Sequence, residues 1–156
     1  MTDEDGKRYL SWPDVESLVN RLVETLPTEY DHLLVVTRGG MIPAALVSQL
    51  TGMRDILVAA VMFYSGPDDR LREPLFLQFP EDPLVAGKSI LVIDDVWDSG
   101  GTCVSVVGRL TRAGAHPEVA VLHYKPTRSD YPESHPDYYV EETEDWIIYP
   151  WQPKGD

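Results

Sequence analysis

Residues 90–104, ILVIDDVWDSGGTCV, constrain the fold more than any other part of this chain. The apolar run Ile90–Ile93 predicts a buried strand, and the acids, serine and glycines after it predict a loop that opens a helix. Glycines let a backbone approach an anion closely, and the free amides at a helix start attract phosphate. The segment therefore predicts a strand, an anion-binding loop at 94–102 and a helix, in that order.

Apolar patterns on both sides of this segment alternate between helices and strands. Helical spacing is found over 12–26, 42–50 and 104–113, whereas short apolar runs at 32–37, 56–64, 89–93 and 119–124 predict buried strands. This order predicts an α/β fold, a mostly parallel β-sheet flanked by helices, in a single domain over residues 1–156. Ligands of such sheets bind beyond the carboxyl ends of the strands, where loops 37–41 and 94–102 fall.

The segment 64–88 is long, polar and rich in Pro, Asp and Gly. Loops of this length in a compact domain are commonly functional, so we expect a small flexible hood here. Within it, the alternation over Leu75–Phe79 predicts an exposed hairpin strand. Arg70 and Arg72 are expected to be solvated, with no firm role in the site. Near the C-terminus, Tyr138–Val140 and Trp146–Tyr149 are expected to be edge strands or covering loops.

Charge and composition narrow the classes of function. The chain carries 13 Lys and Arg against 26 Asp and Glu, a formal charge of −13, and its basic residues are scattered. Such a surface repels nucleic acid and anionic lipid, so neither is an expected partner. No apolar run reaches the length of a membrane span, the first residues do not resemble a signal peptide, and a single cysteine fits a reducing compartment. We therefore expect a cytoplasmic protein.

Three carboxylates stand within five residues at the end of the predicted strand: Asp94, Asp95 and Asp98. Small polar residues and glycines follow them directly: Ser99, Gly100, Gly101 and Thr102. Amides and hydroxyls suit a phosphate, while carboxylates suit sugar hydroxyls and a bound Mg²⁺. The combination predicts a ligand with both a phosphate and a polyol. No Gly-Lys-Ser/Thr follows the glycines, which disfavours a Walker-type NTPase.

Residues 90–102 resemble the 5-phosphoribosyl-1-pyrophosphate (PRPP) motif of type I phosphoribosyltransferases: four apolar residues, two acids, two variable residues, then Asp-Thr/Ser-Gly-Gly/x-Thr. Serine stands at position 99, where threonine is commoner. The resemblance implies that Asp94 and Asp95 bind the ribose hydroxyls, directly or through Mg²⁺. It implies that Asp98 lies near the base and accepts its proton as the catalytic residue. The implied holders of the 5-phosphate are Ser99, Gly100, Gly101 and Thr102.

Two other segments bear on the same resemblance. Alone, Thr37-Arg38-Gly39-Gly40 favours a glycine-broken turn, but it resembles the family's pyrophosphate loop, which implies that Arg38 and Gly39 contact pyrophosphate. Lys125 follows the fourth predicted strand, and Trp146-Ile147 lies near the C-terminus. Members of the family that act on 6-oxopurines have a lysine after this strand, which binds the 6-oxo group. They also have an aromatic residue near the C-terminus that stacks on the purine ring. Without the family, Lys125 would be a surface residue and Trp146 a core residue.

The resemblance implies transfer of the 5-phosphoribosyl group from PRPP to xanthine, guanine or hypoxanthine, with Mg²⁺ as cofactor and pyrophosphate released. It also implies a homodimer or homotetramer, which would bury the aromatic stretches at Phe76–Phe79 and Tyr138–Tyr139. Three alternatives stay open: a PRPP-sensing regulator that binds nucleic acid, a transferase for adenine, uracil or orotate, and a catalytically silent relative. Cys103 is expected to be a packing residue rather than a reactive thiol.

Overall fold

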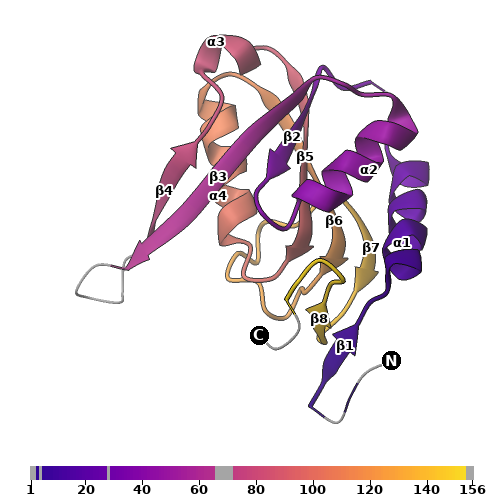
Figure 1. Cartoon of the computed structure of the whole chain (residues 1–156). Coiled ribbons are helices and arrows are strands. Elements are labelled where there is room, and N and C mark those ends of the chain that lie inside the picture. The colour runs from indigo at the N-terminus through magenta and orange to yellow at the C-terminus, as the bar shows by residue number, and fades with distance from the viewer. Residues whose placement is uncertain (1–2, 4, 28, 66–71, 154–156) are drawn as a thin grey trace.

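The computed structural model describes residues 3, 5–27, 29–65 and 72–153, and its centre is a six-stranded sheet in the order β4-β3-β2-β5-β6-β7. Neighbouring strands are parallel throughout, except that β4 (Arg72–Gln78) forms an antiparallel hairpin with β3. The parallel strands are β3 (Ile56–Ser65), β2 (His32–Val36), β5 (Ser89–Trp97), β6 (His116–Tyr124) and β7 (Tyr138–Glu142). The predicted fold, a mostly parallel sheet flanked by helices, is confirmed (Figure 1).

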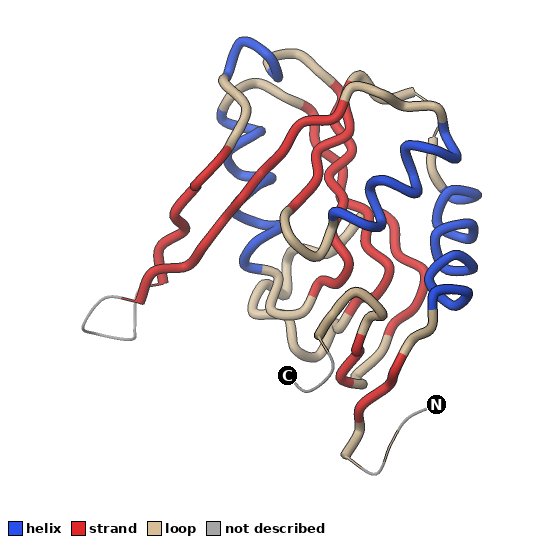
Figure 2. Tube along the Cα trace, viewed as in Figure 1, coloured by secondary structure: helices blue, strands red, loops and turns tan. Residues whose placement is uncertain are grey.

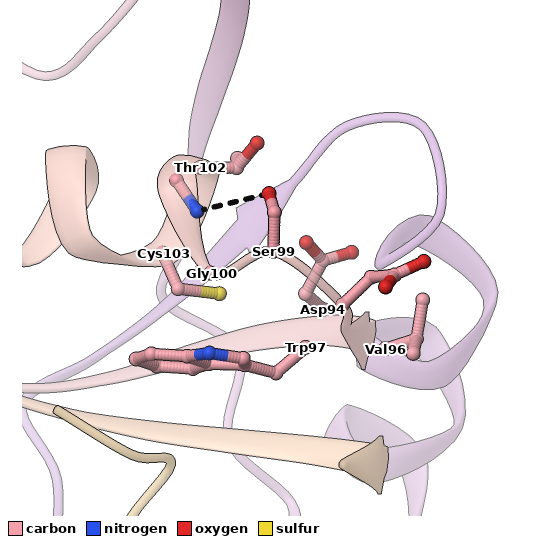
Figure 3. Close-up of a pocket in the computed structure, with 9 residues that line it drawn as sticks. Asp94, Val96, Trp97, Ser99, Gly100, Thr102 and Cys103 are labelled. Carbon is pink, nitrogen blue, oxygen red and sulfur yellow. Dashed lines mark hydrogen bonds between the residues drawn. The ribbon is translucent and has the colours of Figure 1, made fainter. Parts of the chain in front are cut away.

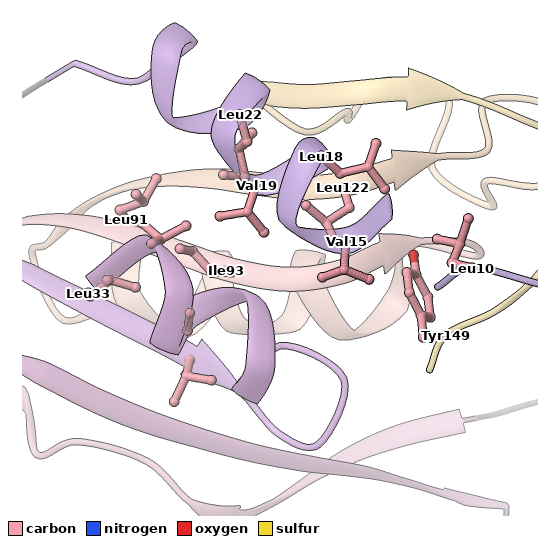
Figure 4. Close-up of a cluster of buried hydrophobic side chains, with 14 of the residues drawn as sticks. Leu10, Val15, Leu18, Val19, Leu22, Leu33, Leu91, Ile93, Leu122 and Tyr149 are labelled. Atoms are coloured by element: carbon pink, nitrogen blue, oxygen red, sulfur yellow. The ribbon is translucent and has the colours of Figure 1, made fainter. Parts of the chain in front are cut away.

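Helices cover both faces of the sheet. The helices α1 (Trp12–Thr25) and α2 (Met41–Thr51) lie on one face, and α4 (Gly101–Arg112) with the short α3 (Asp82–Val85) lies on the other (Figure 1). Strand β5 alternates between the two cores: Leu91 and Ile93 pack under α1 and α2, whereas Ile90 and Val92 pack under α4. Figure 4 shows the first of these cores, built on the buried stripe of α1. This burial on both faces explains why the strands are near-continuous apolar runs.

The first helix begins with a complete capping box. Ser11 is the N-cap residue, and its hydroxyl accepts a hydrogen bond from the backbone N–H of Asp14 at 3.2 Å. The carboxylate of Asp14 accepts from the N–H of Ser11 at 2.7 Å, which completes a capping box. The apolar residues at 3–4 spacing then face the sheet, and four of them are buried: Val15, Leu18, Val19 and Leu22.

The strand order places the loops of interest together. From β2 the chain crosses to β3 on one side, whereas β5, on the other side of β2, leads on to β6 and β7. The order of the sheet therefore reverses between β2 and β5, and ligands of α/β sheets bind at the carboxyl edge of such a point. The loop after β2 and the loop after β5 both leave the sheet at this edge, where Figure 2 shows several loops gathered.

Strand β5 extends further than the apolar pattern indicates. The predicted strand ends at Ile93, but β5 continues to Trp97 because Val96 and Trp97 still pair with His123 and Tyr124 of β6. Likewise, β6 begins at His116 rather than at Val119. The predicted anion-binding loop is therefore shorter than 94–102: Asp94 and Asp95 are strand residues, and the loop proper is 98–100.

The predicted strand at 56–64 is confirmed as β3, but the prediction that it is buried is wrong for most of its length. The pairing of β3 with β2 ends at Ala59, and the rest of β3 has only β4 beside it in the described sheet. As a result Ala59 is buried, whereas Ile56 and Met62 are 43% and 55% exposed. The hairpin of β3 and β4 projects from the sheet in Figure 1, and β4 spans 72–78 rather than the predicted 75–79. Arg70 lies outside the described residues.

Two further differences concern the ends of the chain and the aromatic stretches. The segment β1 (Lys7–Tyr9), which no pattern predicted, forms a small parallel sheet with β8 (Trp146–Ile148). Phe76 and Phe79 are half-buried rather than exposed, because the Arg109 guanidinium lies over both rings at 4.5 and 4.4 Å.

Within the described residues, no helix has the length and apolarity needed to span a membrane.

Candidate active site

The loop after β2 touches the end of β5. Gly39 lies so close to Asp95 that a Cβ atom on Gly39 would be 2.5 Å from either carboxylate oxygen of Asp95. The backbone at Gly39 thus leaves no room for a side chain, and the Arg38 side chain beside it is exposed. The peptide bond between Thr37 and Arg38 is cis. The loop after β2 and the end of β5 line one pocket together, and its lining includes Arg38, Gly39, Asp94 and Asp95.

Asp94 and Asp95 form an acidic pair at the end of β5. The N–H of Asp95 donates to Asp94 Oδ1 at 2.9 Å, and the N–H of Val96 donates to Asp95 Oδ1 at 2.8 Å. Burial, followed by the charge of Asp95, holds the pKa of Asp94 well above its usual value, and burial also raises the pKa of Asp95. Two adjacent carboxylates in this setting favour a ligand that supplies hydroxyl donors or positive charge.

The acidic pair also fits a divalent cation that arrives with its substrate. No described Lys, Arg or His forms an ion pair with either carboxylate. No cluster of three or more His, Cys, Asp or Glu able to hold a metal occurs in the described ranges. Mg²⁺ in phosphate sites takes one or two carboxylates and completes its shell with substrate oxygens and water. Asp94 and Asp95 match that pattern.

The loop 98–100 and the first turn of α4 present backbone amides and hydroxyls that suit an anion. Gly100 has φ +89°, and a Cβ there would collide with the indole of Trp97, so only glycine suits this position. The N-cap residue Gly100 makes no side-chain hydrogen bond, so the amides of the first turn other than that of Gly101 are available to an anion. The Ser99 hydroxyl lies 3.5 Å from the N–H of Gly101 (Figure 3). The pocket beside them is lined by Asp94, Val96, Trp97, Asp98, Ser99, Gly100, Gly101, Thr102 and Cys103.

Two of the predicted base-site residues, Lys125 and Trp146, come together with the predicted catalytic residue Asp98 beside this loop. The ammonium nitrogen of Lys125 lies 3.5 Å from Asp98 Oδ2 and 5.7 Å from the ring centre of Trp146. Lys125 is only 3% exposed, and its backbone N–H donates to the carbonyl of Trp97 at 3.0 Å. Trp146 is 54% exposed, so most of its ring is available for stacking. Taken without the family, the sequence predicted a surface position for Lys125 and a core position for Trp146. Both predictions are wrong, since Lys125 is buried and Trp146 is exposed.

The third predicted base-site residue, Ile147, is placed differently. It lines the same pocket as Lys125 and Trp146, but its side chain is 7% exposed and belongs to the core under α1. Strand alternation explains this, since neighbouring residues of β8 point to opposite sides.

Sequence reasoning missed a buried polar chain behind the pocket. The Tyr149 hydroxyl donates to the backbone carbonyl of Asp95 at 3.2 Å and lies 2.7 Å from His123 Nδ1. Because a carbonyl only accepts, the Nδ1–H of His123 donates to the hydroxyl oxygen. His123 is fully buried, and burial lowers its pKa to about 4. An apolar strand that contains a histidine and a Tyr-Pro-Trp segment was the available signal, but neither pattern shows that the two residues meet.

Cys103 is confirmed as a packing residue. Its side chain is 2% exposed in the core under α4. Burial, and then the charges of Asp94 and Asp95, hold the pKa of its thiol well above the usual value. A thiol in this state is a poor nucleophile.

Fold and site together define an α/β protein whose sheet edge suits a ligand with a phosphate and a polyol. A family model described as the phosphoribosyl transferase domain matches residues 6–156, and the chain belongs to this family. The predicted family is thereby confirmed. The chain is 30% identical over 149 residues to the xanthine-guanine phosphoribosyltransferase of Gluconobacter oxydans. This match covers 91% of this chain and 82% of that protein.

Two solved structures share the fold over nearly their whole length. A purine phosphoribosyltransferase from Pyrococcus horikoshii Ot3 superposes with a TM-score of 0.81 at 33% identity, covering 95% of both chains. A hypothetical protein from Neisseria gonorrhoeae with bound ppGpp superposes with a TM-score of 0.82 at 25% identity. That match covers 96% of this chain and 90% of the other.

Proposed function

We propose that this protein transfers the 5-phosphoribosyl group of PRPP to a 6-oxopurine base, namely xanthine, guanine or hypoxanthine, with release of pyrophosphate. The observation that carries the proposal is the placement of Lys125 Nζ 3.5 Å from Asp98 and over Trp146, next to the anion-binding loop. A buried ammonium suits a 6-oxo acceptor, a carboxylate suits a ring N–H, and an open indole face suits a flat base. The names of the relatives support the same class of acceptor.

PRPP would lie along the carboxyl edge between β2 and β5. Its 5-phosphate would be held by amides and hydroxyls of the loop and first turn: Ser99, Gly100, Gly101 and Thr102. Its ribose hydroxyls would bind the acidic pair, and its pyrophosphate would lie against Arg38 and Gly39, which share a pocket with that pair. Likeness to a protein that binds ppGpp supports this, since ppGpp, like PRPP, is a ribose that carries several phosphates.

The reaction forms one bond and breaks one. The purine nitrogen forms a bond to the anomeric carbon of the ribose, and the bond from that carbon to the pyrophosphate oxygen breaks with its electron pair. Asp98 accepts the proton that the purine loses, while Lys125 holds the 6-oxo group and Trp146 stacks on the ring. Ile147 would contribute its backbone alone, because its side chain is in the core. The exposed Arg38 would bind the departing pyrophosphate.

Magnesium is the proposed cofactor, held by Asp94 and Asp95. When bound, it would neutralise charge on the phosphorylated substrate. The raised pKa values of both carboxylates mean that a cation at this position would relieve an unfavourable arrangement of charge.

The test is a kinetic assay of pyrophosphate release with PRPP, Mg²⁺ and one base at a time: xanthine, guanine, hypoxanthine, adenine, uracil or orotate. We expect turnover with the three 6-oxopurines and a kcat/KM at least about tenfold lower with the others. Lys125 offers no acceptor to the 6-amino group of adenine, and the single ring of uracil or orotate stacks on less of Trp146 than a purine does. No turnover with any 6-oxopurine would overturn the proposal.

The regulatory alternative is tested by filter binding of nucleic acid at low salt, where we expect no retention. The homodimer or homotetramer and the cytoplasmic location stay predictions.

A further inference from the structure

Gln152 lies at the proposed base pocket and has no role in the reaction as described so far. It lines this pocket together with Asp98, Lys125, Trp146 and Tyr149. Its side chain is exposed, so it is available to a ligand in that pocket.

The amide of Gln152 has a fixed orientation. The backbone N–H of Tyr149 donates to Gln152 Oε1 at 2.7 Å, and the N–H of Gln152 donates in turn to the carbonyl of Tyr149 at 3.0 Å. Because a backbone N–H only donates, the side-chain atom that faces Tyr149 has to be the oxygen. The Nε2 amino group thus keeps its donors, and no residue of the described ranges accepts from it. Gln152 therefore presents a hydrogen-bond donor.

Gln152 lies on the side of this pocket nearer the loop after β2, because it also lines the neighbouring pocket of Arg38, Gly39, Asp94 and Asp95, whereas Lys125 does not. Lys125 is attached at Trp97, whose carbonyl accepts from its backbone N–H at 3.0 Å. Tyr149, which orients Gln152, is attached at Asp95 through its hydroxyl at 3.2 Å. Two residues of strand separate these points, roughly 6–7 Å. Lys125 and Gln152 are therefore held by separate contacts and approach the pocket from different sides.

A purine held at the Lys125 end exposes its opposite edge to the Gln152 end. Lys125 and Asp98 would take the 6-oxo group and a proton of the neighbouring imidazole ring, which lie on one edge of the purine. C2 and N3 lie on the other edge. The three 6-oxopurines differ at C2: xanthine has an oxo group, guanine an amino group and hypoxanthine a hydrogen. A donor at this position suits the oxo group and has no acceptor for the amino group.

We propose that Gln152 is a specificity-determining residue that donates from Nε2 to the 2-oxo group of xanthine, so that the enzyme prefers xanthine to guanine. The inference rests on the proposed function and adds a preference within it. The Tyr149 N–H is the cause, because it holds the amide oxygen against the backbone and leaves the Nε2 donors for the base.

The test exchanges the donor for an acceptor at constant size. In Gln152→Glu, one carboxylate oxygen still accepts from the Tyr149 N–H, and the other replaces the amino group with a negatively charged acceptor. The values of kcat/KM for xanthine and guanine are measured on one preparation, each relative to hypoxanthine, which has no substituent at C2. Gln49→Glu, the same change on the exposed side of α2, is the matched control.

We expect the xanthine-to-guanine ratio to exceed one in the wild type, to fall at least about tenfold in Gln152→Glu and to stay within about twofold in Gln49→Glu. Because the ratio is taken within one sample, the fraction of folded enzyme cancels. A wild-type ratio below one, or an unchanged ratio in Gln152→Glu, overturns the inference and leaves the proposed function standing. A wild type inactive with all three bases overturns the proposed function itself. If Gln152→Glu turns over too slowly, the Kd values of the two nucleotide products from calorimetry give the same ratio with the same two readings.

Discussion

Gly39 lies directly against the carboxylate of Asp95, with 2.5 Å between either oxygen and the position of a Cβ atom on the glycine. This contact joins the loop after β2 to the end of β5, at the point where the strand order reverses. It holds the proposed pyrophosphate loop and the proposed ribose site in one arrangement. The carboxylate has little freedom to move away, because Asp95 Oδ1 also accepts from the N–H of Val96.

Gly39→Ala is therefore expected to displace the Asp95 carboxylate or the loop. We expect the KM for PRPP to rise at least about tenfold and the free energy of unfolding to fall by about 1–3 kcal/mol, the usual cost of overpacking. Steady-state kinetics and urea unfolding measure the two effects. Gly108→Ala in α4 is the control, since its Cβ would meet only the end of Arg112 at 3.5 Å. An unchanged KM in Gly39→Ala would show that this contact does not shape the PRPP site.

Asp98→Asn tests the proposed base. The change keeps the size of the side chain but removes its ability to accept a proton, so kcat should fall by about 10²–10⁴. The Kd for PRPP, measured by calorimetry, should stay within about threefold, because Asp98 faces Lys125 on the base side of the site. Asp55→Asn, an exposed carboxylate just before β3, is the matched control. Equal turnover in Asp98→Asn and wild type would refute the role of Asp98.

Lys125→Met tests the 6-oxo contact. Methionine keeps the apolar stem and removes the ammonium group, so the KM for the purine should rise at least about tenfold while the KM for PRPP changes little. Lys88→Met removes an exposed ammonium just before β5 and serves as the control. A rise in the KM for PRPP, with none for the base, would place Lys125 at the phosphate instead.

His123 should make the protein sensitive to mild acid. Burial lowers its folded-state pKa to about 4 from a usual 6.5, so the unfolded state binds the proton first as pH falls. The stabilisation is full above pH 6.5 and declines toward pH 4, by up to roughly 3 kcal/mol. Glu141 and Asp14, whose pKa values are lowered, add to the loss only below about their usual 4.5 and 3.8. Asp94 and Asp95, whose pKa values are raised, act in the opposite direction, so the contribution of His123 is obtained from the difference between a variant and the wild type.

Urea unfolding of the wild type and of His123→Gln between pH 4.5 and 7.5 measures this effect. The slope of the unfolding free energy between pH 6.5 and 4.5 should be smaller in the variant, whatever its absolute stability. Parallel slopes would mean that His123 takes up its proton in the folded protein as readily as in the unfolded chain.

The sheet and the proposed phosphate loop were predictable from the sequence because their signals are local. Continuous apolar runs mark strands covered on both faces, and the Ser-Gly-Gly-Thr run marks a helix start that binds anions, so 90–104 was informative alone. The end of β5 was not predictable in the same way. Asp94 and Asp95 read as loop residues, yet pairing of Val96 and Trp97 with β6 keeps them in the strand.

Contacts between distant segments were beyond local pattern. The short β1 pairs with β8 across almost the whole chain, and three residues of mixed character give no periodic signal. The exposure of β3 depends on where its neighbour β2 ends, which the apolar run of β3 does not record. Resemblance to the family was the only basis for placing Lys125 and Trp146 in the base site. The roles of Tyr149 and Gln152 depend on the turn over 149–152, which brings both residues to the pocket and which no sequence pattern predicts.

The central claim is the transfer of a phosphoribosyl group to a 6-oxopurine, and a competition in one tube tests it most directly. The wild-type enzyme is incubated with PRPP, Mg²⁺ and equal concentrations of xanthine, guanine, hypoxanthine, adenine, uracil and orotate, and the nucleotides formed are identified by mass. The account predicts the 5′-monophosphates of the 6-oxopurines, in an amount equal to the pyrophosphate released. Nucleotides of adenine, uracil or orotate as the main products, or no nucleotide at all, would contradict it.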